Sequence, residues 1–225
     1  MINQPKLQAV IFDVDGTLLD SVDDHAKAWV DAFHEYGHRV CFEAVRRQIG
    51  KGGDQLMPVF MTREEIDDYG EALDRERGRI MKDRYLPLIK PFRAVRALLE
   101  RVRADGKQIA LASSATRDDL TAYKRIASIE DLVDVETSSD DAERSKPCPD
   151  IFQAALGRLS GIRPERILAV GDTAYDAEAA AKAGIRTVGL LCGGWSASDL
   201  KLAGCIAVYK DPADLLAHYG DSPLA

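Results

Sequence analysis

The chain has 225 residues, of which 46% are hydrophobic and 30% charged, and its formal net charge is -7. This length allows one large domain or a core with a smaller inserted domain, and the negative charge disfavours a general nucleic-acid or anionic-membrane surface. No apolar run is long enough to span a membrane, the first six residues do not form a signal peptide, and the four cysteines are widely spaced. We expect a soluble cytoplasmic protein with reduced thiols, without nucleic-acid or membrane partners.

An apolar run over residues 7–12 predicts a strand that is covered on both faces. It is followed directly by Asp13, Val14, Asp15, Gly16 and Thr17. Two carboxylates this close repel each other unless a cation or a shared proton offsets their charge. A divalent metal with a phosphate group would suit them, because carboxylates hold Mg2+ and free backbone amides hold phosphate oxygens. The alternative is an ordinary Asp-Gly turn that closes a hairpin.

The next part of the chain has apolar residues at helical spacing. Thr62 and Glu65 have the spacing of a capping box and open the longest predicted helix, and Pro87 and Pro91 end the helical block. The predicted helices cover about residues 26–36, 42–48 and 62–85, with a glycine-rich break at 49–53. The segment therefore forms an all-helical insertion after the first strand.

After Pro91, apolar strands alternate with amphipathic helices. The predicted strands cover residues 108–112, 133–137, 167–170, 187–191 and 205–208. The predicted helices cover residues 95–102, 116–127, 150–159, an alanine-rich stretch that ends at Gly184, and 211–219. This alternation implies an α/β fold, a Rossmann-like parallel sheet with helices on both faces. We predict a catalytic core made of residues 1–19 and 91–225, and a helical cap domain made of residues 20–90.

Polar side chains follow the predicted strands at the edge where parallel sheets bind ligands. Ser113 and Ser114 follow the second strand, and Asp172 and Asp176 follow a later one. Lys146 precedes a predicted helix in a loop with two prolines. With the first two aspartates, these residues offer carboxylates for a metal, and a hydroxyl and an ammonium for phosphate, which favours phosphoryl transfer.

Each of these residues also has a structural interpretation. Ser113 could cap the following helix, although Thr116 is better spaced for that role. Lys146 could be a solvated loop lysine, and Asp176 could favour the start of its helix through the helix dipole.

The four motifs, in this order, resemble the haloacid-dehalogenase superfamily of phosphatases and phosphomutases, and the resemblance covers essentially the whole chain. It implies that Asp13 is the nucleophile and forms an aspartyl-phosphate. It also implies that Asp15 protonates the leaving oxygen and then takes a proton from the attacking water. The second aspartate favours phosphate esters over halogenated acids, because the dehalogenases of the superfamily lack it.

The resemblance further implies a Mg2+ cofactor. Asp13, the backbone carbonyl of Asp15, and Asp172 would hold the ion, and Asp176 could reach it through water. Ser113 would bond a phosphoryl oxygen, while a lysine at position 146 would offset the charge of the phosphate.

Within the superfamily, residues 20–25 and 145–152 resemble the β-phosphoglucomutase and phosphoglycolate phosphatase-like subgroup, which has a helical cap. A histidine at the place of His25 assists proton transfer there, although a histidine in the first turn of a helix could equally be solvated. Ser114, Lys51 and Gly52 are further candidates for binding substrate, against the alternative that residues 50–53 are a flexible connector.

A phosphomutase needs a second phosphate site, usually with an arginine in this loop, and Lys51 is the only cation of residues 50–54. We therefore predict a Mg2+-dependent phosphatase of a small phosphate monoester, such as a sugar phosphate or phosphoglycolate. The alternatives are a β-phosphoglucomutase-like mutase and a non-catalytic binding protein on the same fold. The non-catalytic alternative predicts the loss of at least one catalytic motif residue. All four are present in the sequence, namely Asp13, Asp15, Lys146 and Asp172. The oligomeric state is left open.

Overall fold

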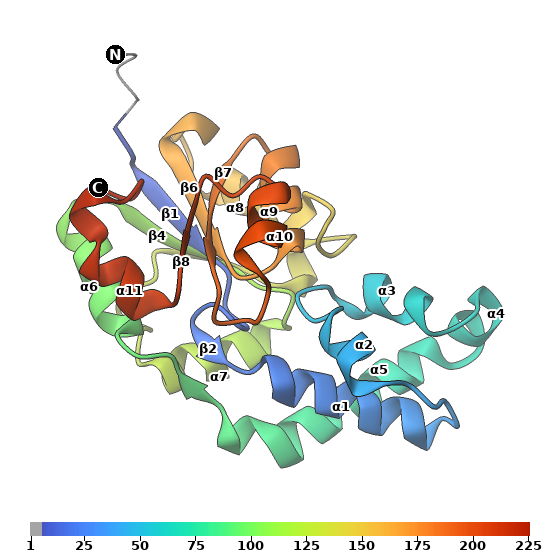
Figure 1. The fold of residues 1–225 in the computed structure, drawn as a ribbon. Helices are drawn as coiled ribbons and strands as arrows, with labels where there is room; N and C mark the ends of the chain where they lie inside the picture. The colour runs from blue at the N-terminus through green and yellow to red at the C-terminus, as the bar shows by residue number, and fades with distance from the viewer. Residues whose placement is uncertain (1–5) are drawn as a thin grey trace.

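The computed structural model describes residues 6–225, and its core is a six-stranded parallel sheet in the order β5-β4-β1-β6-β7-β8 (Figure 1). The strands are β1 (Ala9–Phe12), β4 (Gln108–Ala112), β5 (Val135–Thr137), β6 (Ile167–Gly171), β7 (Arg186–Leu190) and β8 (Ala207–Tyr209). The predicted α/β class with a Rossmann-like parallel sheet is confirmed. The predictions for residues 1–5, at the start of the core, lie outside the described residues.

Several strands are shorter than, or shifted from, the apolar runs that predict them. β1 begins at Ala9 rather than at residue 7, β5 begins two residues late, and β8 lies two residues further at its start. Cys205 is buried, but its backbone N–H bonds the carbonyl of Leu200 and closes the preceding helix. An apolar run thus indicates which residues are buried. Some buried residues at its ends do not form the hydrogen bonds of the sheet.

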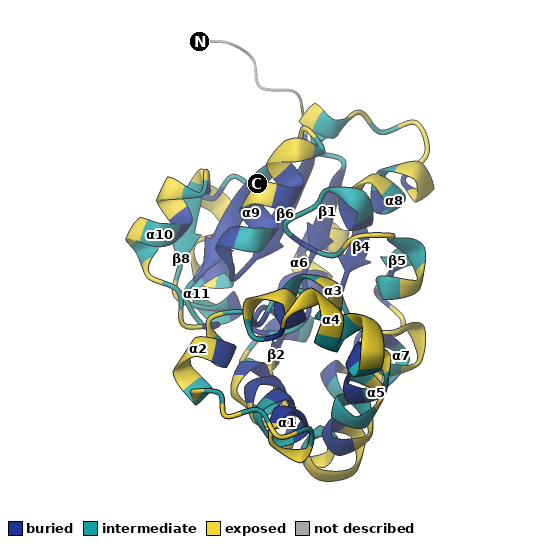
Figure 2. Cartoon of the chain, turned by 90° about the vertical axis from the view of Figure 1, so that its right-hand side faces the viewer, coloured by how far each residue is buried: buried dark blue, intermediate teal, exposed yellow. Residues whose placement is uncertain are grey.

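Both faces of the sheet are covered, as the near-continuous apolar strands require. Val10 and Phe12 face a cluster formed with α6 (Val95–Ala104), α7 (Arg117–Ala127) and α11 (Pro212–Ala217). Ala9 and Ile11 face the opposite cluster, formed with α8 (Asp150–Arg158) and α9 (Ala174–Lys182). α10 (Ala197–Leu202), which the sequence does not predict, covers the edge near β7 and β8. Figure 2 shows the strands as the most buried part of the molecule.

A helical segment leaves the sheet after β2 (Leu19–Asp20) and returns at β3 (Lys90–Pro91). These two short strands pair antiparallel. The two connections between the sheet and the helical segment therefore lie side by side. The segment's helices α1, α2 and α5 lie together beyond one end of the sheet (Figure 1). The helices are α1 (Val22–Glu35), α2 (Phe42–Arg46), α3 (Gly53–Leu56), α4 (Arg63–Glu65) and α5 (Glu71–Ile80), with 3-10 turns η1 (Met57–Val59) and η4 (Leu86–Leu88).

The long helix predicted from residue 62 is present but not uniform. Its capping box forms in both directions between Thr62 and Glu65. Two π-helical turns, η2 (Ile66–Gly70) and η3 (Met81–Tyr85), flank α5 within it. Apolar spacing predicts a helix but does not resolve such one-residue changes in hydrogen-bond pitch.

No helix within residues 6–225 is both long and apolar enough to cross a membrane. The four cysteines are free thiols.

Candidate active site

Three neighbouring strands of the sheet end in polar side chains. Asp13 follows β1, Ser113 follows β4, and Asp172 follows β6. Since β1 pairs with both β4 and β6 in parallel register, the three residues meet at the carboxyl edge of the sheet. This is the edge at which open parallel sheets bind ligands.

Lys146 lies within this group of carboxylates. Its Nζ is 2.6 Å from Asp13 Oδ1 and 2.7 Å from Asp176 Oδ1, and it donates to the carbonyl of Ala112 at 3.0 Å. The side chain is fully buried, so the alternative of a solvated loop lysine is wrong. Asp176 has its predicted position at the start of α9, because its other oxygen accepts from the N–H and hydroxyl of Thr173, while its predicted role near a metal stays a prediction.

Asp13, Asp172 and Asp176 form a buried carboxylate cluster whose ligand atoms lie within 4.8 Å of one another. Asp172 Oδ1 accepts from the Thr17 hydroxyl at 2.8 Å, whereas its Oδ2 has no hydrogen-bond partner among the described residues. An unpartnered buried carboxylate oxygen is costly. The donor set, three hard oxygen ligands with one oxygen left free, fits a Mg2+ ion.

Two glycines allow the chain to approach Asp172 this closely. A Cβ at Gly16, where φ is +81°, would lie 2.4 Å from Asp172 Oδ2, and a Cβ at Gly193 would lie 1.6 Å from it. Any side chain at either position would therefore displace the carboxylate. Gly16 is therefore needed for two reasons: its positive φ forms the turn after β1, and its lack of a side chain leaves room for Asp172.

Burial dominates the electrostatics of the cluster. It raises the pKa of Asp13 to about 7, against the opposing attraction of Lys146. Burial, with the nearby charges of Asp13 and Asp176, also raises the pKa of Asp172 well above its usual range. Burial disfavours the ammonium of Lys146, but the adjacent carboxylates outweigh that effect and raise its pKa. One ammonium cannot offset three buried carboxylates, so without a metal the cluster retains protons that a divalent cation would displace.

Asp15 points away from this cluster. Its Oδ1 lies 2.9 Å from His25 Nε2 and accepts from the Ser21 hydroxyl at 2.7 Å. Burial acts to raise the pKa of Asp15, but these two partners outweigh it and hold the pKa below its usual value. The Tyr123 hydroxyl lies 3.3 Å from the same His25 nitrogen, and only 9% of His25 is exposed, so the alternative of a solvated histidine is wrong.

The two adjacent serines after β4 have different positions. Ser113 is fully buried, and its Oγ accepts from the N–H of Ala115. Ser114 lines the cavity and donates to the carbonyl of Gly50. Thr116 caps α7, so the helix-capping alternative for Ser113 is wrong.

A cavity of about 280 Å³ opens between this edge of the sheet and the helical segment. Asp13, Asp15, His25, Lys51 and Gly52 all line it, so the glycine-rich loop borders the reaction centre. The loop's arginine neighbours do not line the cavity. Arg46 pairs with Asp23 at 2.6 Å, and Arg47 lies 3.9 Å over the ring of Trp195 in the core.

Sequence reasoning missed four residues of the site. Thr17 holds Asp172, Tyr123 contacts His25, and Asp74 and Arg77 line the cavity from α5. Thr17 belongs to the first motif, so its place in the motif was an available signal. The other three come from helix faces whose orientation no local pattern reveals.

Comparison with known proteins agrees with this geometry. The family model described as haloacid dehalogenase-like hydrolase matches residues 10–190. The chain belongs to this family. The superfamily predicted from the four motifs is thereby confirmed, and with it the prediction that the protein is an enzyme of the hydrolase class.

Named relatives and solved structures match over most of the chain. A phosphorylated carbohydrates phosphatase of Thermotoga maritima is 30% identical over 211 residues, covering 93% of this chain and 97% of the relative. A phosphoglycolate phosphatase of Nitrosospira multiformis is 30% identical over 183 residues, covering 79% of this chain and 80% of the relative. The crystal structure of a hydrolase from Pseudomonas syringae superposes with a TM-score of 0.85 at 29% identity, covering 95% of this chain and 98% of that one.

Proposed function

We propose that this haloacid dehalogenase-like hydrolase is a Mg2+-dependent phosphatase that hydrolyses a small phosphate monoester through an aspartyl-phosphate on Asp13. The observation that carries the proposal is the separation of two neighbouring carboxylates. Asp13 lies in the buried cluster beside Lys146, while Asp15 is held apart by His25 and Ser21. This separation supports Asp13 as the nucleophile and Asp15 as the acid and base.

The fit of the carboxylate cluster to Mg2+ supports a proposed set of ligands. Asp13, Asp172 and the backbone carbonyl of Asp15 would hold the ion, with Asp176 within reach through water. Bound Mg2+ would offset the charge of the carboxylates and of the phosphate. Lys146 adds the fixed positive charge beside the nucleophile.

The protein's own residues supply the bond changes. An oxygen of Asp13 forms a bond to phosphorus as the ester oxygen leaves, and Asp15, in its protonated form, gives that oxygen a proton. In the second step Asp15 takes a proton from water, and the water oxygen displaces Asp13 and releases phosphate. The Ser113 hydroxyl already accepts from Ala115, which leaves its own hydrogen for a phosphoryl oxygen.

We further propose that residues 20–90 act as a cap domain over a core of residues 1–19 and 91–225. The paired strands β2 and β3 form both connections between the proposed core and cap, and they would serve as the hinge. His25, Lys51 and Gly52 reach the cavity from the cap, and Ser114 reaches it from the core. We place the enzyme in the cytoplasm, where its free thiols would stay reduced.

Phosphate release from p-nitrophenyl phosphate tests this function. We expect release that requires Mg2+ and is lost in Asp13→Asn. Undiminished release in that variant would contradict the proposal. Incubation with a hexose 1-phosphate and a trace of its bisphosphate separates a phosphatase, which releases phosphate, from a mutase, which forms the isomer.

A further inference from the structure

The part of the cavity beyond the reaction centre is acidic. Four carboxylates line it outside the catalytic pair, against two cations. The six residues are Asp54, Asp74, Asp119, Glu143, Lys51 and Arg77. If the phosphate binds at the sheet edge, as the proposed function requires, these side chains would face the group that leaves with the ester oxygen.

The guanidinium of Arg77 is already neutralised inside the protein. Its Nε and Nη2 donate to Asp74 Oδ1 at 3.1 and 2.6 Å, and the guanidinium lies 5.1 Å from the Trp29 ring. An arginine that binds a substrate anion presents its paired N–H groups to that anion. Here two of those donors are spent on a carboxylate one helical turn away.

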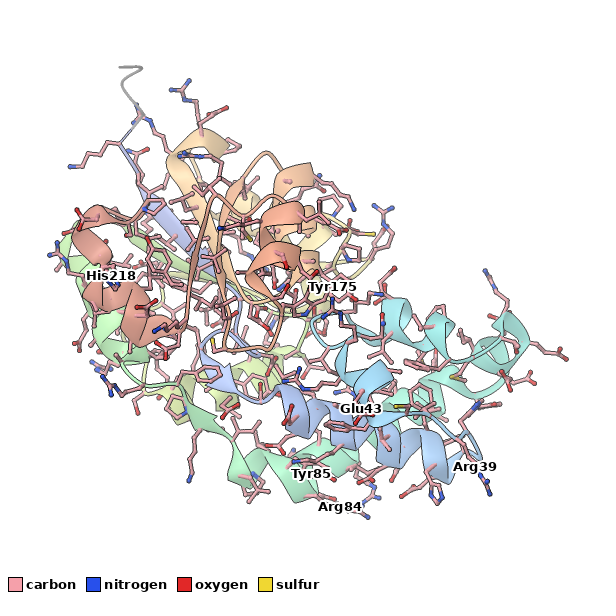
Figure 3. All side chains as sticks on the ribbon, in the orientation of Figure 1. Arg39, Glu43, Arg84, Tyr85, Tyr175 and His218 are labelled. Atoms are coloured by element: carbon pink, nitrogen blue, oxygen red, sulfur yellow. The ribbon has the colours of Figure 1, made fainter. Side chains whose placement is uncertain are left out.

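The second cation, Lys51, is engaged differently, because the partners that it contacts are uncharged. Its ammonium donates to Gln48 Oε1 at 2.6 Å and lies 4.6 Å from the ring of Tyr175. Figure 3 shows Tyr175 on the core, where it approaches the helical segment. Lys51 therefore helps to join the two parts of the chain, while one of its three ammonium donors is used by Gln48.

From this charge distribution we infer that the enzyme selects a neutral, hydroxyl-bearing leaving group and rejects an anionic one. A carboxylate or second phosphate on the leaving group would face four carboxylates and two cations, of which Arg77 is already paired with Asp74. Hydroxyl groups would donate to the same carboxylates. The inference rests on the proposed phosphatase function and adds a substrate class, phosphorylated polyols and sugars, with the Asp74–Arg77 pair as the specificity determinant.

Two substrates that differ in one group test this inference. 2-Hydroxyethyl phosphate carries a hydroxymethyl group where phosphoglycolate carries a carboxylate. We expect kcat/KM for 2-hydroxyethyl phosphate to exceed that for phosphoglycolate by roughly tenfold or more, the scale of one like-charge contact in a cleft. Equal values, or a preference for phosphoglycolate, would overturn the inference.

Variants of the pair sharpen the test. Asp74→Asn frees Arg77 and should move the ratio of the two kcat/KM values toward phosphoglycolate by about tenfold, while Arg77→Gln should move it the other way. Because the readout is a ratio within one variant, a general loss of activity cancels. Asp68→Asn, an exposed aspartate outside this cavity, should leave the ratio unchanged. An unchanged ratio in Asp74→Asn would also overturn the inference.

A generic substrate separates this inference from the function on which it rests. Where turnover of the small esters is too slow, their inhibition constants against p-nitrophenyl phosphate give the ratio of their binding affinities, which the same charge contacts should shift in the same direction. Failure to hydrolyse p-nitrophenyl phosphate with Mg2+ would refute the phosphatase itself. Hydrolysis of that ester with phosphoglycolate as the stronger ligand would refute the charge selection alone.

Discussion

Lys146 supplies the only ammonium within the buried carboxylate cluster described above. Its contacts with Asp13 and Asp176 explain how a lysine can be fully buried and still charged. The position of Lys146 in a proline-rich loop gave little sign of this burial, since the motif predicts the residue but not its depth. Asp13, Asp15 and Asp172 were easier to place, because each lies within a few residues of the end of a predicted strand.

Lys146→Met should therefore harm both activity and stability. We expect a loss of about 100-fold or more in kcat and about 3 kcal/mol in the free energy of unfolding, because two buried carboxylates lose their cation. Phosphate release and denaturant unfolding measure the two effects. The exposed Lys201→Met is the control, and a Lys146 variant that matches it in both assays would contradict this role.

Gly193 offers a test of the metal cluster in which every ligand residue is retained and only the position of Asp172 is disturbed. Gly193→Ala puts a Cβ within 1.6 Å of the present Asp172 Oδ2, so the carboxylate must move. We expect the Mg2+ concentration for half-maximal activity to rise by about tenfold or more. Gly157→Ala, where the added Cβ meets nothing within 4 Å, should leave it unchanged. Equal Mg2+ requirements in the two variants would count against the assigned site.

At the scale of elements, the sheet and its flanking helices were largely predictable, because buried strands read as apolar runs and amphipathic helices repeat with a period near 3.6. The short elements were not. α3, α10 and the β2–β3 pair have two to six residues each, and their existence depends on contacts distant in sequence. For the same reason the sequence did not reveal Asp74 and Arg77. They line the cavity only because of the orientation of α5.

Arg47, which directly follows α2, contacts residues that follow the later strands of the sheet. Arg47 stacks on Trp195 at 3.9 Å and pairs with Asp199 at 3.0 Å, and its carbonyl accepts from the Tyr175 hydroxyl. These contacts are the kind that must break when a cap opens.

Arg47→Ala should loosen this contact without unfolding the protein. We expect amide hydrogen exchange in α2 to rise by up to about tenfold, because a cation–π contact and an ion pair together stabilise by about 1–2 kcal/mol. The melting temperature should change little. Arg39→Ala, at an exposed cap position, serves as the control, and identical exchange in both variants would show that α2 does not depend on Arg47.

At the scale of the whole molecule, the raised pKa of Asp13 links stability, pH and metal. Without burial and nearby charges, as in the unfolded chain, its pKa is 3.8. In the folded protein its pKa is about 7. The folded protein therefore binds more protons across that window, so the metal-free fold loses stability as pH rises through it. Mg2+ competes with those protons and binds more tightly at higher pH.

The increase in melting temperature on adding Mg2+ should consequently be larger near pH 8 than near pH 6. Bound ligand stabilises by an amount that grows with its concentration relative to the dissociation constant, and that constant falls as the cluster deprotonates. Thermal unfolding with Mg2+ and with a chelator, at both pH values, measures the effect. A larger increase at the lower pH would contradict the linkage.

The account depends most on Asp13 as the residue that carries the phosphoryl group. Acid quenching during turnover of p-nitrophenyl phosphate with Mg2+, followed by peptide mass spectrometry, locates that group directly. We predict a phosphoryl adduct on Asp13 that accumulates during turnover and is absent from Asp13→Asn. An adduct on another residue, or continued turnover by Asp13→Asn, would contradict the account.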